Sequence, residues 1–122
     1  MRVLAGPYAV CRLPPDAEVP AWAHAGDVSV VARTPEEVSI FVAQAAVPAD
    51  VAHASGYALL GVLGPLPLSW TGILARLSRV LADADVPILA MCTYDTDYLA
   101  VPDAKLTDAV AALRADGIVV ER

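Results

Sequence analysis

The polar segment Cys92-Thr93-Tyr94-Asp95-Thr96-Asp97-Tyr98 carries the side chains of this chain that are best suited to chemistry. It lies between the apolar runs 88–90 and 99–101, which are typical of strands that enter and leave a core. Because side chains alternate along an extended strand, Asp95 and Asp97 would point to the same side if the backbone stays extended here. Two neighbouring carboxylates repel each other unless a cation lies between them, so the segment predicts a pocket for an ammonium group. The alternative is a solvated turn, because Asp and Thr are ordinary turn residues.

A second candidate is Thr71-Gly72, at the expected start of a helix. The first amides of a helix have no partner within it, and with the positive end of the helix dipole they suit a carboxylate. Gly72 has no Cβ and would let a ligand approach the backbone closely, although a glycine that only serves packing is the alternative. If Asp97 lies nearby, it can accept a charge-assisted hydrogen bond from an ammonium. Both charged ends of an amino acid would then be bound.

Composition limits the class of protein. The chain has 122 residues, so we expect one ordinary domain or two very small ones. Because 57% of the residues are hydrophobic and 18% are charged, we expect an ordered protein. We also expect part of its apolar surface to be covered by the partner subunit of a homodimer. The net charge of −6 argues against nucleic-acid binding. The longest apolar stretch, 56–68, contains two prolines and is shorter than the ~20 residues that span a bilayer, so no membrane segment is expected.

The cysteines, Cys11 and Cys92, lack the paired spacing of metal or disulfide sites, and no secretory signal is visible at the start of the chain. We therefore expect two buried, reduced thiols in a cytoplasmic protein. The histidines, His24 and His53, are far in sequence from Cys92, so a catalytic pair is not expected. Two aspartates without a third acidic ligand do not predict a metal site, and no glycine-rich phosphate loop is present, so we expect no cofactor and no enzymatic activity.

Hydrophobic periodicity predicts two similar halves, 1–55 and 56–122. In the first half we expect a short helical turn near 14–25 and strands at 8–13, 27–33 and 38–45. In the second half we expect a helix from about 69–72 to 84, a helix near 106–113, and strands at 57–63, 86–91, 97–101 and 118–120. This order is βαββαβ and predicts an α+β, ferredoxin-like fold, with an antiparallel four-stranded sheet and both helices on one face. The first half has the same order in abbreviated form.

Four strings in this order and spacing, Glu37-Val38-Ser39-Ile40, Gly64-Pro65-Leu66, Thr71-Gly72-Ile73-Leu74-Ala75 and the polar segment 92–98, resemble small ACT-domain proteins of the type found in the CASTOR arginine sensors. The resemblance runs from about Val28 to the end of the chain. It implies a tandem of ACT-like units that catalyse no reaction and bind amino acids at the interface between units.

By position, the resemblance implies ligand contacts at eight residues, which are Ser39, Ile40, Gly72, Ile73, Thr93, Tyr94, Thr96 and Asp97. Thr96 stands where the arginine sensors have an aromatic residue, so a bulky apolar wall is missing. For Ser39 an exposed strand hydroxyl is the alternative.

The function predicted from the sequence is a regulatory module that binds a small amino acid or similar zwitterion, with a possible regulated partner protein. The rival is a protein-protein interaction module without a small ligand, in which the polar segment is only a turn. An enzyme that uses the pair Asp95 and Asp97 ranks third.

Overall fold

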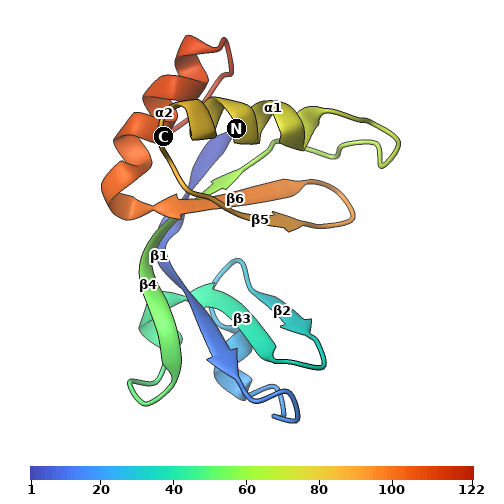
Figure 1. The fold of residues 1–122 in the computed structure, drawn as a ribbon, viewed down its shortest axis with the longest axis vertical. Helices are drawn as coiled ribbons and strands as arrows, with labels where there is room; N and C mark the ends of the chain where they lie inside the picture. The colour runs from blue at the N-terminus through green and yellow to red at the C-terminus, as the bar shows by residue number, and fades with distance from the viewer. The chain divides into compact units, whose positions relative to one another are not determined.

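The computed structural model describes all 122 residues and divides them into two compact units (Figure 1). The N-terminal unit is Gly6–Tyr57, and the larger unit combines Met1–Ala5 with Ala58–Arg122. Two long strands, β1 (Arg2–Leu13) and β4 (Ala52–Gly61), contribute residues to both units. The first five residues therefore belong to the larger unit, whereas the sequence placed them in the first half.

The larger unit has the strand order β1-β4-β6-β5. After β4 the chain forms α1 (Ile73–Asp83), β5 (Leu89–Cys92), β6 (Asp97–Pro102), a 3₁₀ turn (Asp103–Lys105) and α2 (Leu106–Ala115). Strands β5 and β6 are antiparallel, and both helices lie on one side of this hairpin (Figure 1). The predicted α+β, ferredoxin-like fold is confirmed.

The core of the larger unit lies between the helices and the sheet. Its largest fully buried side chains come from four elements and are Leu60, Leu81, Leu99, Val101 and Leu113. On α1, Leu77 and Leu81 face this core, as the periodicity predicts. Trp70 lies where the sequence predicts the start of this helix, but it precedes α1 and is 61% exposed. The backbone N–H of Trp70 donates to the Pro67 carbonyl at 3.0 Å, so Trp70 belongs to a turn that leads into α1.

The last strand predicted, 118–120, is replaced by a single parallel bridge between Arg2 and Glu121. The Val3 N–H donates to the Glu121 carbonyl at 2.9 Å, and the Glu121 N–H donates to the Met1 carbonyl at 2.9 Å. The amino-terminal ammonium donates to the Val119 carbonyl at 2.7 Å. The end of the chain therefore pairs with the start of β1, which itself lies beside β4 in the sheet.

The N-terminal unit has the strand order β2-β3-β1-β4, with β2 at Val30–Arg33 and β3 at Val38–Ala43. Short 3₁₀ turns at Ala21–His24 and Gln44–Ala46 stand between its strands. The element order is thus strand, 3₁₀ turn, strand, strand, 3₁₀ turn, strand. The buried members of its core are Cys11, Ala23, Val38, Ile40 and Val42.

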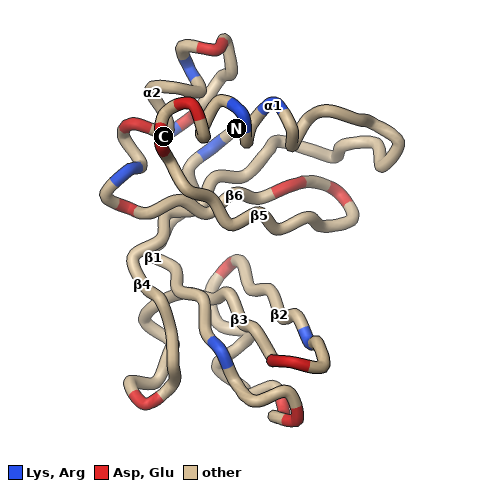
Figure 2. The backbone as a smooth tube through the Cα atoms, in the orientation of Figure 1, with Lys and Arg blue, Asp and Glu red and all other residues tan.

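Charged residues are sparse along the chain (Figure 2). Asp95 lies in the β5–β6 turn and Asp97 begins β6. No helix of the structure has both the length and the apolar character needed to cross a membrane. No group of three His, Cys, Asp or Glu side chains is placed to hold a metal ion.

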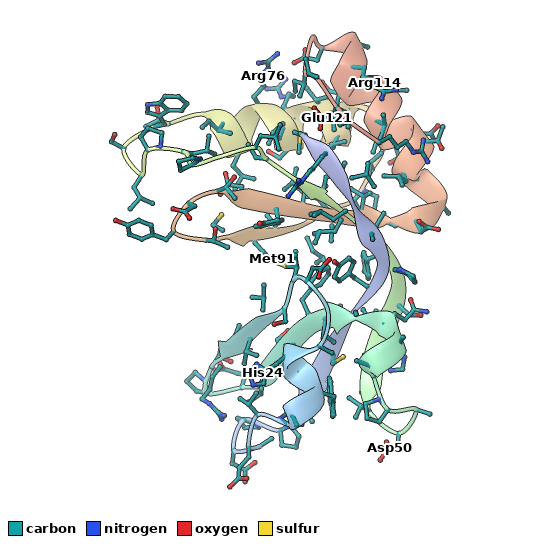
Figure 3. All side chains as sticks on the ribbon, turned by 180° about the vertical axis from the view of Figure 1, so that it is seen from behind. His24, Asp50, Arg76, Met91, Arg114 and Glu121 are labelled. Carbon is teal, nitrogen blue, oxygen red and sulfur yellow. The ribbon has the colours of Figure 1, made fainter.

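Figure 3 shows Arg76 on α1, and its Nε donates to Asp116 Oδ2 at 2.9 Å. This surface ion pair joins α1 to the end of α2.

Candidate functional site

The polar segment forms a tight hairpin turn in which Cys92, the last residue of β5, pairs with Asp97, the first residue of β6. The Thr93 N–H donates to the Thr96 carbonyl at 2.8 Å, and the Thr96 N–H donates to Thr93 Oγ1 at 3.2 Å. The backbone is therefore not extended through residues 94–95. The condition under which Asp95 and Asp97 would point to the same side is therefore not met, and the two residues line different cavities of the larger unit.

The segment 62–66, which leads from β4 toward α1, is held against this turn by three hydrogen bonds. The N–H of Val62 donates to the Asp97 carbonyl at 3.0 Å, the N–H of Leu66 donates to the Asp95 carbonyl at 2.6 Å, and Thr96 Oγ1 donates to the Val62 carbonyl at 2.7 Å. Gly64 is required here, since a Cβ at this position would lie 2.9 Å from the Asp95 carbonyl oxygen. The position of the turn relative to the approach to α1 is thereby set.

Between the turn and the start of α1 lies a cavity of about 230 Å³, which we call the α1 cavity. Leu66 and Trp70 form apolar parts of the cavity wall. Six of the eight residues predicted as ligand contacts line this cavity, and they are Gly72, Ile73, Thr93, Tyr94, Thr96 and Asp97. The structure therefore brings a helix start and a carboxylate to one open space.

The start of α1 leaves its first amides without a side-chain cap. Gly72 is the N-cap residue, with φ of 84°, and its carbonyl accepts the Arg76 N–H at 3.0 Å. A Cβ at Gly72 would meet no atom within 4 Å. Glycine is thus favoured at this position by its left-handed backbone rather than by tight packing. The residues of the first helical turn, whose amides have no partner within the helix, follow directly and line the cavity.

Asp97 is half-buried, and its carboxylate interacts with the thiol of Cys92. The hydrogen bond from the thiol to Asp97 raises the pKa of Cys92, with smaller contributions from burial and from the negative charge of Asp97. Cys92 is exposed, so the prediction of two buried thiols is wrong for this residue and holds for Cys11 alone. Sequence reasoning missed Cys92 as part of the cavity wall, although its position directly before the polar turn was a usable signal.

Two predicted contacts, Ser39 and Ile40, do not line the α1 cavity. They lie on β3 in the N-terminal unit, opposite Arg12 and Cys11 of β1. Ile40 is fully buried in the core of that unit, and Ser39 is half-buried. Their role as ligand contacts stays a prediction.

Two family models match the chain. The ACT domain model matches residues 53–115, just over half of the chain, and a model described as an N-terminal domain matches residues 6–50. No curated protein matches the sequence.

Solved structures of other proteins share the fold. A protein from Agobacterium tumefaciens has 28% sequence identity and a TM-score of 0.91, with 99% of this chain and 92% of that chain covered. A Vibrio cholerae protein of unknown function, described as a possible transport protein, has 18% identity and a TM-score of 0.76, with coverage of 93% and 85%.

The regulatory subunit of aspartate kinase from Thermus thermophilus, in its ligand-free form, has 13% identity and a TM-score of 0.61, with coverage of 89% and 90%. At such low identity, this likeness and that to the Vibrio protein show the fold alone. The match to the family model, which covers the helices and the hairpin turn, shows more: the chain belongs to the ACT domain family.

Proposed function

We propose that this chain is a regulatory module that binds a small amino acid or a similar zwitterion in the α1 cavity and catalyses no reaction. The observation that carries the proposal is that Gly72 and Asp97 line the same cavity. Uncapped amides at the start of α1 suit a carboxylate, and the Asp97 carboxylate suits an ammonium. Membership of the ACT domain family and the fold shared with a regulatory subunit of aspartate kinase support a regulatory role.

The size and walls of the α1 cavity favour a small ligand. Its volume of about 230 Å³ is below the ~300 Å³ at which pockets for drug-sized molecules begin. The Thr96 hydroxyl already donates to the Val62 carbonyl, so its hydrogen is not available to the ligand. Leu66 and Trp70 offer apolar contact to a short side chain. Ser39 and Ile40 do not line this cavity, so their contact with a ligand is a separate prediction. Binding at an interface between ACT-like units, and a homodimer, are likewise separate predictions.

Calorimetric titration of the chain with each of the twenty amino acids tests this function. We expect at least one saturable ligand, whose heat of binding is lost in Asp97→Ala because the ammonium then has no counter-charge. At a ligand concentration a hundredfold above Kd, the free energy of unfolding should rise by roughly 2.7 kcal/mol.

Asp83→Ala is the matched control, since Asp83 is an exposed aspartate of α1 that does not line the α1 cavity. It should leave the heat unchanged. No heat with any amino acid, or an unaltered Kd in Asp97→Ala, would contradict the proposal.

A second candidate function is a protein-interaction module, and exposed apolar side chains around the same cavity favour it. Leu68, Trp70 and Tyr94 line the α1 cavity and are 71%, 61% and 81% exposed. Large exposed apolar groups on one surface are typical of a protein contact. This candidate would be preferred if no amino acid changed the thermal stability while Trp70→Ser altered the oligomeric state in sedimentation.

A further inference from the structure

The larger unit contains a second cavity, of about 410 Å³, that the proposed function does not use. Arg2 of β1 lines it, together with Asp95 and Tyr98 of the hairpin and the segment 61–65. We call it the Arg2 cavity. Thr96 lines both this cavity and the α1 cavity, so the hairpin turn forms a wall of each.

Arg2 and Asp95 bring opposite charges to the Arg2 cavity without neutralising each other. The ion pairs of the chain are Arg76 with Asp116 and Lys105 with Asp85, and neither Arg2 nor Asp95 takes part in one. Both residues are exposed, and both line the cavity. A guanidinium has a planar donor fork that matches a carboxylate, and a carboxylate accepts hydrogen bonds from an ammonium. A ligand that carries both charges would satisfy the two side chains at once.

The backbone that carries these two charges is held in place. Arg2 forms a bridge with Glu121, and the Asp95 carbonyl accepts the Leu66 N–H at 2.6 Å. A Cβ at Gly61 would lie 3.2 Å from the ring of Tyr98 and 3.3 Å from Leu4, so this wall has no space for a side chain. The cavity is therefore a feature of the folded unit rather than a gap between mobile loops.

We propose that the Arg2 cavity is a second binding site for a zwitterionic amino acid, whose carboxylate binds the Arg2 guanidinium and whose ammonium binds Asp95. Its volume exceeds that of the α1 cavity, so it accepts a longer side chain. The site stands on its own residues and does not depend on ligand binding at Gly72 and Asp97.

Amide chemical shifts of the ¹⁵N-labelled full chain test the site residue by residue, with each of the twenty amino acids added singly. We expect at least one amino acid to move the amides of Gly61, Gly64 and Tyr98 in a saturable way. Arg2→Gln should weaken that Kd by about tenfold or more, since a charge-assisted contact is lost. Arg2→Lys should retain part of the affinity, because it keeps the charge and loses the planar fork.

Arg79→Gln is the control, because Arg79 is an exposed arginine of α1 that lines neither cavity. It should leave every shift unchanged. In Asp97→Ala the shifts at Gly61 and Gly64 should persist, while any shifts at Gly72 and Ile73 should vanish. If the amides of Gly72 and Ile73 do not shift with any amino acid while those of Gly61 and Gly64 do, the proposed function is rejected and the site in the Arg2 cavity is retained. Unmoved amides around the Arg2 cavity, or an equal Kd in Arg2→Gln, would overturn the inference.

Discussion

Asp97 combines two interactions that depend on its charge. The residue lines the α1 cavity, and its carboxylate accepts the hydrogen bond that raises the pKa of Cys92. The neutral thiol is thereby favoured, and thiols react with alkylating agents as thiolates. The rate at which Cys92 is alkylated therefore depends on Asp97, and it can be measured before any ligand is identified.

Asp97→Asn should lower the pKa of Cys92, because both the carboxylate acceptor and the negative charge are removed. The pH profile of alkylation by iodoacetamide, followed by mass spectrometry, should move to lower pH in this variant, with a faster rate near neutral pH. Asp95→Asn is the matched control and should leave the profile in place, since Asp95 makes no contribution to the Cys92 pKa. Buried Cys11 should stay unmodified throughout. Identical profiles for the two variants would show that Asp97 does not act on the thiol.

The connection between β4 and α1 relies on two glycines for different reasons. Gly72 has a positive φ and open space around it, whereas Gly64 has almost no space for a Cβ. The first constraint is conformational and local. The second comes from the close approach of the hairpin turn, which hydrogen bonds hold against this segment.

Gly72→Ala should reduce the free energy of unfolding by ~1–2 kcal/mol, the cost of a left-handed conformation for a residue with a Cβ. Gly72→Asn should cost less, because Asn tolerates this conformation better. Gly64→Ala should cost more than Gly72→Ala, since its Cβ would approach a backbone oxygen at 2.9 Å and displace the turn. Urea denaturation measures all three. An equal loss for Gly64→Ala and Gly72→Ala would show that the turn moves freely away from residues 62–66.

The assembly of the larger unit depends on both ends of the chain. Residues Met1–Ala5 belong to it although more than fifty residues separate them from Ala58 in the sequence. Hydrogen bonds of Met1 and Val3 with Glu121 join the start of β1 to the C-terminal segment. The N-terminal unit has the strand order β2-β3-β1-β4 and 3₁₀ turns where the larger unit has helices, which supports the internal duplication that stays a prediction.

Val3→Pro should destabilise the larger unit, because proline cannot donate the hydrogen bond that the Glu121 carbonyl accepts at 2.9 Å. Val3→Ala is the control, since it keeps the N–H and removes only side-chain packing. We expect Val3→Pro to cost at least ~1 kcal/mol more than Val3→Ala, and the Glu121 amide to lose protection in hydrogen exchange. Equal stability of the two variants would mean that the ends of the chain fold independently of each other.

Local pattern was enough to predict much of the fold and part of the site. Apolar periodicity predicted α1 and α2, because a helix must bury one stripe of side chains whatever its neighbours are. The β5–β6 hairpin followed from two apolar runs around a polar turn. The match to the ACT domain model supports the family resemblance that these motifs indicated.

Long-range contacts settled what periodicity left open. The two carboxylates of the hairpin line different cavities because hydrogen bonds close the turn at Thr93 and Thr96, a geometry that strand alternation does not describe. The expected last strand is reduced to one bridge with Arg2, because the extent to which a segment pairs is set by packing across the whole unit. Gly72 and Asp97 share a cavity for the same reason: residues far apart in sequence meet only when helix and sheet pack together.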